Sequence, residues 1–499
     1  MKLKRLLNEL EVLDYRLDAS AECTALLTDS RRAVPGGLFF AISGLKEDGN
    51  DFIEEAVGRG VVAVVSEQAM GKHFPINYIQ VSNVRLALAQ VAKIFYGSPD
   101  RSLAITGVTG TNGKTTVSML AQHLLGGSES VGLIGTIRYD IGKRTLPSHR
   151  TTPESTDCFQ LFSEMCEANC KAAVMEVSSH GIDQYRVNFI EMDTVVFLNL
   201  SRDHMDYHPT MEDYFQVKQR LFSGVLGTSA KRAIVNSDCP YGQKLLAGLD
   251  SAVDRFSFGL DAGAQFRAID LELAADGTRF NLLYPGGKIA VDSPLLGRHN
   301  VYNTLAAMAI AYVQGGSLSE CVEALSSFSG VPGRMEQIQA GQDFSVLVDY
   351  AHTADAVEHA CEMLGELSTG KKIIVFGCGG DRDCGKRPLM MRAALDGADS
   401  LVVTADNPRT EQIESIFSDM RAGIESQAEA DRVYFIEDRK NACARAFELA
   451  TAGDCVLIAG KGHEVYQEID GTMIPFDDRK VARELLENRG AGRSDRLTV

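Results

Sequence analysis

The alternation of hydrophobic and polar positions divides the chain into three blocks. In the first, residues 1–100, an apolar run at 36–43 predicts a short strand, and an amphipathic stretch at 86–97 predicts a helix. The leucines near the N-terminus are spaced along one face of a helix: Leu3, Leu6, Leu7, Leu10 and Leu13. This block predicts a small mixed α/β domain.

The second block, residues 101–332, follows a turn-rich break at 97–100. Three continuously apolar runs, at 172–179, 194–201 and 232–238, are typical of parallel strands that are covered by helices on both faces. We expect a central P-loop ATPase-like α/β domain here.

The third block, residues 333–499, begins in a Gly- and Pro-containing stretch. Strand–helix alternation starts again there, with apolar runs at 345–350, 372–378, 400–407 and 454–460. Open α/β sheets bind ligands at the carboxyl ends of their strands, and Gly, Asp, Asn or His stands at the end of each run. The predicted fold class is therefore α/β with three domains, the last one Rossmann-like.

Composition narrows the functional classes. The net charge of −17 and the absence of any Lys/Arg block argue against nucleic acid or an anionic membrane as the main partner. No apolar run approaches the roughly 18 residues of a membrane span, and the N-terminus lacks the apolar core of a signal peptide. Eleven cysteines lie without paired spacing, and no histidine accompanies Cys166 and Cys170, so we expect reduced thiols in a cytoplasmic protein.

A glycine-rich stretch, "GVTGTNGKTT" at 107–116, lies between a predicted strand and a predicted helix. Backbone N–H groups of such a loop can surround phosphate oxygens, Lys114 can reach the terminal phosphates of ATP, and Thr115 can bind Mg²⁺. Val108 stands where the strict P-loop pattern has glycine, so a glycine-rich turn without a ligand is the alternative. The expected nucleotide contacts in the loop are Gly110, Thr111, Asn112, Gly113, Lys114, Thr115 and Thr116.

Two further stretches of the second block carry ionisable groups where a buried strand ends. Glu176 would cost several kcal/mol in such a place unless it is paired or bound to a metal, and with Thr115 it suits one Mg²⁺. The stretch at 201–208 adds two acids and two histidines. Lys218 lies on a predicted helix among apolar residues, where a lysine ordinarily extends its amine to solvent.

The stretch "TGTNGKTT" resembles the Mur ligase family, the ATP-dependent amide-forming enzymes of peptidoglycan and folate metabolism. In that family the lysine equivalent to Lys218 is carbamylated by CO₂ to N6-carboxylysine and joins His204 around a second Mg²⁺. The resemblance thus implies Lys114, Glu176, His204 and Lys218 as catalytic residues. It implies these metal ligands: Thr115, Glu176, His204 and Lys218.

The resemblance extends to the nucleotide and to the first substrate. "GRHNVYNTLAA" at 297–307 and "DYAHT" at 349–353 look like ATP-contacting segments. With the arginine after Gly333 they imply these ATP contacts: His299, Asn300, Asn303, Arg334 and Asp349. "TDSRRAVPGGLFFAISG" at 28–44 looks like the uridine-binding part of the peptidoglycan ligases, with contacts at Leu45–Glu47 left open. The implied contacts to the UDP-muramoyl-dipeptide are Thr28, Ser30, Thr151, Thr152, Ser178, Gln184 and Arg186.

Three loops of the third block follow buried strands and predict a pocket for a zwitterion. Arg382 and Arg409 can grip carboxylates, while Glu464 can accept an ammonium group. "DNPR" at 406–409 is similar to the motif of the branch that adds meso-diaminopimelate, and Arg409 would bind its second carboxylate. Lysine would leave that arginine buried and unpaired. The expected diaminopimelate contacts are Arg382, Asp406, Asn407, Pro408, Arg409, Gly460 and Glu464.

The resemblance implies an activity. ATP and Mg²⁺ would drive the addition of meso-diaminopimelate to the D-glutamyl γ-carboxylate of UDP-N-acetylmuramoyl-L-Ala-D-Glu through an acyl phosphate, in a protein expected to be a monomer. The alternatives are a lysine-adding ligase of the same family, a folylpolyglutamate synthetase, a P-loop switch and an inactive scaffold. The base that deprotonates the amine, and any redox role of Cys378 and Cys384, stay open.

Overall fold

The structure is a computed structural model. It describes residues 1–18, 20–44, 47–69, 74–205, 207–274, 276–368 and 370–494, with side chains as far as Arg489. The chain divides into two compact units, one of Met1–Arg267 with Leu305–Cys321 and one of Ala268–Thr304 with Val322–Val499. Each is described by itself.

The first unit begins with a five-stranded sheet of order β1-β5-β4-β3-β2. Only β1 runs antiparallel to its neighbour, and the other neighbouring pairs are parallel. The strands are β1 (Val12–Arg16), β2 (Ala25–Leu27), β3 (Gly37–Phe40), β4 (Ala63–Ser66) and β5 (Asn77–Val81). The helices are α1 (Leu3–Leu7), α2 (Ile53–Gly58) and α3 (Val84–Phe95).

The strand and the helix predicted for this block are confirmed as β3 and α3, but the N-terminal helix is shorter than predicted. It ends at Leu7, and Leu13 is 59% exposed on β1. The pairing of β1 with β5, from Val12↔Val81 to Arg16↔Tyr78, holds the chain extended there. Hydrogen bonding to a neighbouring strand therefore overrides the leucine spacing.

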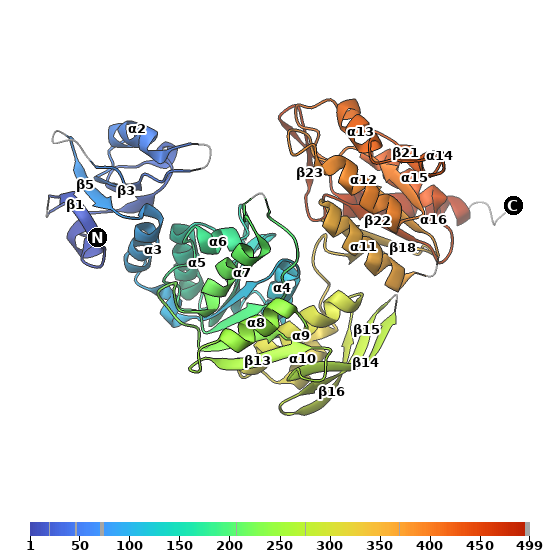
Figure 1. Ribbon diagram of the computed structural model, residues 1–499, viewed down its shortest axis with the longest axis horizontal. Coiled ribbons are helices and arrows are strands. Elements are labelled where there is room, and N and C mark those ends of the chain that lie inside the picture. Colours follow the sequence, from blue (N-terminus) through green and yellow to red (C-terminus); the bar gives the residue numbers. More distant parts are fainter. Residues whose placement is uncertain are drawn as a thin grey trace. The chain divides into compact units, whose positions relative to one another are not determined.

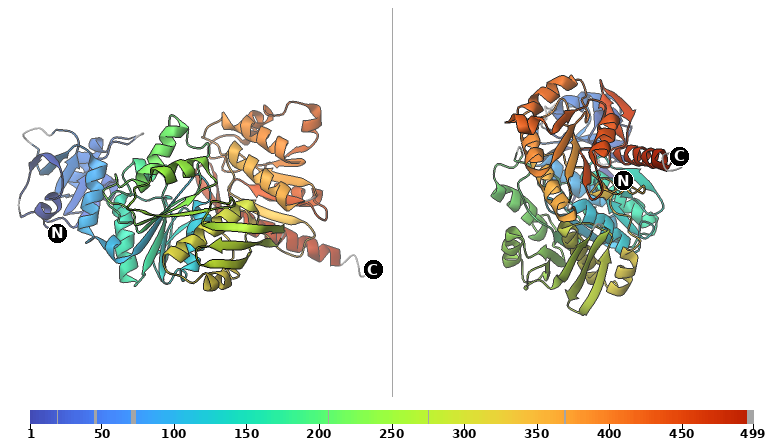
Figure 2. Two further views of the ribbon diagram at one scale, coloured as in Figure 1. Left: turned by 60° about the horizontal axis from the view of Figure 1, so that its bottom comes forward. Right: turned by 90° about the vertical axis from the view of Figure 1, so that its right-hand side faces the viewer.

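A second sheet follows in the order β16-β15-β14-β13-β12-β11-β6-β10-β7-β8-β9. Its parallel strands are β6 (Ala104–Thr109), β7 (Val131–Ile134), β10 (Ala172–Glu176), β11 (Thr194–Phe197), β12 (Arg232–Asn236) and β13 (Asp254–Gly259). Helices accompany them (Figures 1 and 2): α4 (Lys114–Leu124), α5 (Ser155–Glu167), α6 (Ser179–Asp183), α7 (Met211–Gln219), α8 (Pro240–Gly248), α9 (Arg298–Val313) and α10 (Leu318–Leu325). The three buried strands predicted in this block are confirmed as β10, β11 and β12.

Further strands that the apolar runs did not predict extend this sheet on both sides, with β16 and β9 at its edges. They are β8 (Arg138–Asp140), β9 (Thr145–Pro147), β14 (Phe266–Ala274), β15 (Gly277–Tyr284) and β16 (Gly287–Ser293). In β15 buried and partly exposed positions alternate from Thr278 to Leu283, as in a strand with one solvated face. A search for continuous apolar runs passes over such strands.

The second unit contains a six-stranded sheet of order β17-β18-β22-β19-β20-β21 and a separate hairpin. The strands are β17 (Glu336–Gln337), β18 (Ser345–Asp349), β19 (Lys372–Phe376), β20 (Ser400–Val403), β21 (Val433–Phe435), β22 (Cys455–Ala459), β23 (Tyr466–Ile469) and β24 (Thr472–Pro475). The helices are α11 (Ala354–Leu367), α12 (Lys386–Gly397), α13 (Ile413–Arg421), α14 (Gln427–Ala430), α15 (Arg439–Leu449) and α16 (Asp478–Ser494).

Helices cover both faces of this sheet, so the four apolar runs predicted in the third block are confirmed as buried parallel strands. One core packs the sheet against α11, α12 and α13, and another packs it against α15 and α16 (Figure 1). The strand order places β19 between β20 and β22. The loops after these three strands carry the predicted zwitterion-binding residues.

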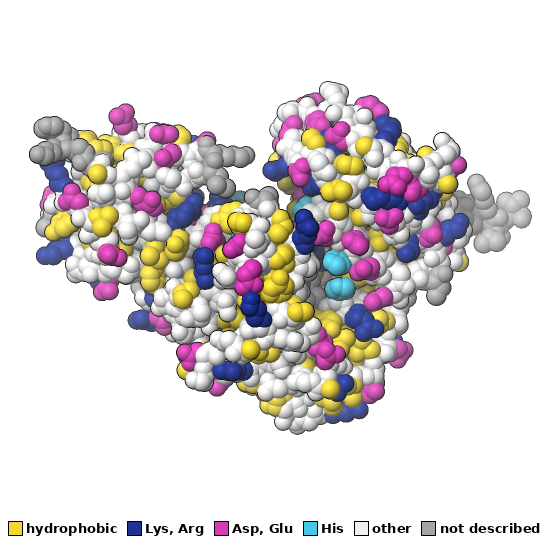
Figure 3. Space-filling view, viewed as in Figure 1, with side chains coloured by type: hydrophobic (Ala, Val, Ile, Leu, Met, Phe, Trp, Pro, Cys, Tyr) yellow, Lys and Arg dark blue, Asp and Glu magenta, His cyan; other side chains and the backbone are white. Residues whose placement is uncertain are grey.

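The surface carries both signs of charge. On the face shown in Figure 3, Lys and Arg are interspersed with Asp and Glu. Within the described ranges, no helix combines the length and the apolar character that a membrane crossing requires.

Candidate active site

The phosphate loop of the first unit joins β6 to α4. Gly113 has φ +88°, which favours glycine, and a Cβ on Gly110 would lie 2.9 Å from the Cβ of Leu198. The backbone N–H groups of Thr111 and Asn112 donate to Asn199 Oδ1 over 3.1 and 2.9 Å. The loop is thus held in shape by a side chain from another strand end.

Lys114 folds back over this loop. Its Nζ donates to Gly110 O over 2.8 Å and to Thr111 O over 2.9 Å. These carbonyls hold the ammonium at the mouth of the loop, beside the N-terminus of α4. A cation and a helix N-terminus together favour bound phosphate.

Glu176 ends β10 and is 1% exposed. Its Oε2 accepts hydrogen bonds from Thr115 Oγ1 and Thr136 Oγ1, both over 3.0 Å, and its Oε1 accepts one from Thr136 N over 2.8 Å. These three bonds offset the desolvation of the carboxylate. The sequence prediction that Thr115 and Glu176 lie together is confirmed, and their oxygen donors fit Mg²⁺.

Lys218 on α7 is 1% exposed. Its Nζ donates to Gly110 O over 3.1 Å and lies 4.7 Å from the centre of the Tyr214 ring. Burial, reinforced by the charge of Lys114, lowers the pKa of Lys218 well below its ordinary value. The ordinary expectation of an amine that extends to solvent is therefore wrong for this lysine.

His204 follows β11 and adopts φ +54°. Its ring centre lies 4.9 Å from that of His180 and 6.1 Å from that of Tyr214. Desolvation is the main cause that lowers the pKa of His204, and the charge of Lys114 acts in the same direction. A neutral imidazole is the form that can bind a metal ion.

A network of hydroxyl groups surrounds Glu176. Thr136 Oγ1 lies 3.0 Å from Thr151 Oγ1, and Thr152 Oγ1 donates to Glu176 O over 2.9 Å. The hydroxyl of Thr152 also lies 3.1 Å from Ser178 Oγ, which caps α6 by accepting from Gly181 N. Two strand ends and a helix start are thereby fixed to one another.

Arg186 extends the network. Its Nη1 donates to Thr152 O over 3.0 Å, its Nη2 donates to Gln184 Oε1 over 2.7 Å, and its Nε lies 3.2 Å from Glu154 Oε1. Burial lowers the pKa of this guanidinium. The structure thus brings together five predicted contacts to the first substrate: Thr151, Thr152, Ser178, Gln184 and Arg186.

The first unit also contains a cavity of about 1310 Å³. The other two predicted contacts to this substrate, Thr28 and Ser30, line it, and so do four arginines: Arg31, Arg32, Arg85 and Arg150. Ser30 Oγ donates to Glu55 Oε2 over 2.6 Å. The five residues of the Arg186 network are absent from its described lining. Leu45 and Lys46 lie outside the described residues.

The predicted adenine- and ribose-side residues belong to the second unit. Asn300 Nδ2 donates to Leu296 O over 2.9 Å, and Asn303 Nδ2 donates to Asn300 Oδ1 over 2.8 Å. The ring centre of His299 lies 6.1 Å from that of His359, and burial lowers the pKa of His299. Two side-chain amides and an imidazole on the first turns of α9 are thereby fixed in orientation.

Arg334 and Asp349 meet at the start of the six-stranded sheet. The Arg334 guanidinium lies 5.0 Å from the centre of the Tyr350 ring, and among the described residues its buried Nε has no hydrogen-bond partner. The Asp349 carboxylate accepts from Met335 N over 2.8 Å and from Ala351 N over 2.9 Å. Desolvation raises the pKa of Asp349. A buried donor without a partner fits a residue that completes its bonds on a ligand.

Three loops of the second unit gather the predicted amine-binding residues. Asn407 Nδ2 donates to Glu464 Oε2 over 3.0 Å, and the fully buried Lys461 donates to Asn407 Oδ1 and to Glu464 Oε2, both over 2.9 Å. A Cβ on Gly460 would lie 2.6 Å from Asp406 Oδ2, so the two loops approach closely. Pro408 is buried beside them, whereas Arg382 is exposed on its loop.

Arg409 is paired within the structure, contrary to the prediction that a lysine ligand would leave it buried and unpaired. Its Nε donates to Glu468 Oε2 over 3.0 Å, and its side chain is 21% exposed. An empty or lysine-filled pocket would therefore not leave this guanidinium buried and unpaired. Sequence reasoning could not see Glu468 as its partner, because the two residues are 59 positions apart.

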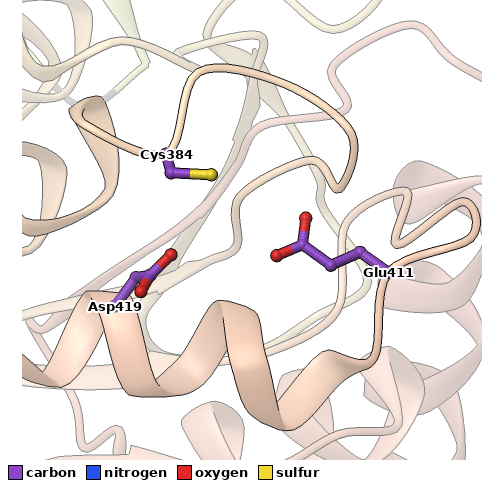
Figure 4. Close-up of side chains that lie close together, drawn as sticks. All are labelled: Cys384, Glu411 and Asp419. Atoms are coloured by element: carbon purple, nitrogen blue, oxygen red, sulfur yellow. The ribbon is translucent and has the colours of Figure 1, made fainter.

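A cysteine and two carboxylates lie close together near these loops (Figure 4). Cys384, Glu411 and Asp419 could in principle surround a metal ion. The fully buried Arg387 already donates to both acids, over 2.6 Å to Glu411 and 2.8 Å to Asp419. This cluster is therefore an ion-pair network that supports the loop of Arg382. The Cys378 thiol is buried, and burial raises its pKa to about 12.

Comparison with known proteins identifies the family. Three family models match in succession: "Mur ligase family, catalytic domain" over residues 22–96, "Mur ligase middle domain" over 108–311 and "Mur ligase, glutamate ligase domain" over 333–462. A UDP-N-acetylmuramoyl-L-alanyl-D-glutamate--2,6-diaminopimelate ligase of Solibacter usitatus is 43% identical over 95% of each chain. The chain belongs to the Mur ligase family.

Other Mur ligases give the same result. The enzyme of the same name from Geobacillus thermodenitrificans is 41% identical over 98% of this chain and 100% of its own. A solved structure of a ligase of that name matches with a TM-score of 0.71 and 35% identity, over 98% of this chain and 99% of that chain. These matches bear out the three-domain α/β fold class that the sequence predicts, whereas the exact domain limits stay a prediction.

Membership in the Mur ligase family also decides between classes of activity. The chain is an ATP-dependent amide ligase, so the alternative of a P-loop switch is wrong. A structure described as the MurF ligase of Thermotoga maritima in complex with ADP shares the fold, with a TM-score of 0.61 at 18% identity.

Proposed function

We propose that this Mur ligase joins meso-diaminopimelate to the D-glutamyl γ-carboxylate of UDP-N-acetylmuramoyl-L-Ala-D-Glu, a step of peptidoglycan precursor synthesis. The observation that carries this proposal is full-length similarity of 43% and 41% to relatives named for that reaction. The loop with Asn407 and Arg409 supports it, because a guanidinium and an amide suit an amino acid with an additional carboxylate.

The reaction begins with activation of the acid. The γ-carboxylate of the D-glutamyl residue attacks the γ-phosphorus of ATP, the bond to the β,γ-bridging oxygen breaks, and an acyl phosphate and ADP form. Lys114 and the N-terminus of α4 offset the negative charge that both reactants bring together. Arg334 completes its hydrogen bonding on the nucleotide, and Asn300, Asn303, His299 and Asp349 contact it.

The amine of diaminopimelate then attacks the acyl carbon. The tetrahedral intermediate expels phosphate, and the nitrogen loses a proton as the amide forms. Among the described residues, the hydrogen bonds of Glu464 to Asn407 and Lys461 use Oε2, so we assign Oε1 to the ammonium group of the substrate. The Arg186 network holds the muramoyl-dipeptide, and the cavity with Thr28 and Ser30 holds its uridine end.

The residues around the phosphate loop fit Mg²⁺. Thr115 and Glu176 would hold one ion, and His204 with a modified Lys218 would hold a second. When bound, Mg²⁺ supplies positive charge against the transferring phosphoryl group. Lys218 is suited to carbamylation because its neutral amine can attack the carbon of CO₂ and lose a proton, which leaves an anionic carbamate.

Three further features belong to this proposal. We place the domain limits near residues 100 and 333, and we take the active protein to be a monomer in the cytoplasm, where nucleotide-linked precursors are made. Light scattering of the purified chain would test the monomer. A mass near twice 54.2 kDa would contradict it.

The first experiment is phosphate release from ATP in the presence of UDP-N-acetylmuramoyl-L-Ala-D-Glu, with meso-diaminopimelate or L-lysine as the amine. Turnover with diaminopimelate and little with lysine is the expected result. Equal turnover would remove the specificity from the proposal. Turnover with lysine alone would assign the chain to the lysine-adding alternative.

A further inference from the structure

The hairpin β23–β24 is paired with the loop that carries Arg409. Arg409 N donates to Glu468 O over 3.0 Å, and Asp470 N donates to Arg409 O over 2.7 Å. Arg409 has φ +53°, a conformation that side chains other than glycine rarely adopt. The hairpin therefore fixes the backbone of this arginine in a strained, defined position.

The side chain of Arg409 is fixed as well. Nε donates to Glu468 Oε2 over 3.0 Å and Nη1 donates to Gly380 O over 2.7 Å. Nη2 makes no hydrogen bond to any residue that the structure describes. Glu468 is itself held, because its backbone N–H donates to Asn407 Oδ1 over 2.9 Å. The Nε side of the guanidinium thus has a carboxylate partner within the protein, while Nη2 keeps N–H donors for a ligand.

We propose that Glu468 sets how strictly the chain selects a diacid over a monoacid amine. This inference rests on the proposed function. Glu468 keeps Arg409 paired when the amine substrate has no second carboxylate, so such a substrate loses less than it would in a pocket with an unpaired arginine. When diaminopimelate binds, its distal carboxylate shares the guanidinium with Glu468, and the two negative charges repel each other.

The pairing of Arg409 with Glu468 and the repulsion between Glu468 and the distal carboxylate both lower the selectivity for diaminopimelate over lysine. Removal of the Glu468 charge should strengthen binding of diaminopimelate and weaken binding of lysine. Glu468→Gln serves this purpose because the amide oxygen can still accept from Arg409 Nε while the charge is lost. Since both side chains are partly exposed, at 21% and 26%, we expect an increase of about fivefold in the ratio of kcat/KM for diaminopimelate to that for lysine.

The test compares the purified full chain with its Glu468→Gln and Glu468→Ala variants. Phosphate release gives KM and kcat for each amine, and calorimetry gives the affinity for diaminopimelate without turnover. The matched control is Glu448→Gln, which removes a carboxylate paired with Arg445 on exposed positions of α15. In Glu468→Gln we expect the KM for diaminopimelate to fall, the KM for ATP to stay constant and kcat to change little.

An unchanged or smaller ratio in Glu468→Gln would overturn the inference. Weaker diaminopimelate binding in that variant would also overturn it, since Glu468 would then orient Arg409 rather than compete with the ligand. If Glu468→Gln fails to fold, Glu468→Ala must show the same rise in the ratio for the inference to stand. No turnover of diaminopimelate by the unaltered chain would instead overturn the proposed function.

Discussion

Lys218 is a lysine whose amine is shielded from solvent, beside Gly110 O and above the ring of Tyr214. A cation in such a place is unfavourable, and the neighbouring Lys114 makes it more so. Burial therefore favours the neutral amine, which is the form that reacts with CO₂. At the residue scale, burial thus makes Lys218 chemically suited to the proposed carbamylation.

Replacement of Lys218 by methionine should lower the rate of ligation by about 100-fold or more, because methionine cannot form the proposed carbamate that would hold a second Mg²⁺. Phosphate release measures the rate, and NMR with ¹³C-bicarbonate should detect a carbamate signal only in the unaltered chain. Lys244→Met is the control, since Lys244 also lies over an aromatic ring, 4.9 Å from that of Phe215, but is exposed. Full activity of Lys218→Met would contradict this prediction.

Thr136 contacts both carboxylate oxygens of Glu176. Thr136→Val keeps the shape and the backbone donor but removes the hydroxyl, so the carboxylate is less firmly oriented. We expect the Mg²⁺ concentration for half-maximal activity to rise about 10- to 100-fold, as for other residues that orient metal ligands. Thr228→Val, which removes a hydroxyl bonded to Ile190 O, should leave the Mg²⁺ dependence unchanged.

At the scale of elements, Arg439 links the ends of two strands that are not neighbours in the sheet, β20 and β22. Because β19 separates β20 from β22, no ladder hydrogen bond can join the ends of these two strands. The fully buried guanidinium donates to Ala459 O over 2.8 Å and to Ala405 O over 3.4 Å, and it pairs with Asp478 at 2.7 Å. Two of the loops that carry the predicted amine-binding residues begin at these strand ends.

Arg439→Met should destabilise the second unit by about 3–5 kcal/mol, because Asp478 would remain as a buried unpaired charge. The double variant Arg439→Met, Asp478→Leu should recover much of that loss, since it removes both charges together. Denaturant unfolding measures both variants. A double variant less stable than the single one would show that the backbone bonds of Arg439, rather than the ion pair, dominate.

At the scale of the whole molecule, partly desolvated histidines predict sensitivity to acid. Desolvation lowers the pKa of His204, His299 and His352, although their side chains reach the surface, and it lowers that of the half-buried His463 to about 4 from an ordinary 6.5. Between about pH 6.5 and pH 4 the unfolded chain binds protons that the folded chain does not, so stability falls as the pH falls through this window.

For His463 alone this loss should approach 3 kcal/mol when the pH has reached about 4. Urea unfolding at pH 7 and pH 4 measures it. His463→Gln should reduce the difference in unfolding free energy between the two pH values, because glutamine binds no proton in either state. An equal difference in the variant would mean that other groups carry the acid sensitivity.

Local sequence patterns were enough to predict the buried strands, the phosphate loop and the family of this protein. Continuous apolar runs were enough to predict seven buried parallel strands, namely β10, β11, β12, β18, β19, β20 and β22, because a strand buried on both faces has few polar positions. The P-loop stretch also predicted that Gly113, Lys114 and Thr115 lie at one strand–helix junction, because these residues are adjacent in the sequence. The resemblance of the loop motifs then led to the Mur ligase family.

The tertiary structure decided what depends on distant partners. Leu13 follows a helical spacing, yet it lies on a strand because β5 offers hydrogen bonds. In the sequence, Arg409 looks like an arginine without a partner that waits for a substrate carboxylate. In the structure it is paired with Glu468, which lies 59 positions further along the chain. The sequence around Lys218 is typical of a surface lysine, whereas in the structure its amine is enclosed by Gly110 and Tyr214. The sequence fixes which groups are available, but burial and pairing between distant segments determine their charge and their partners.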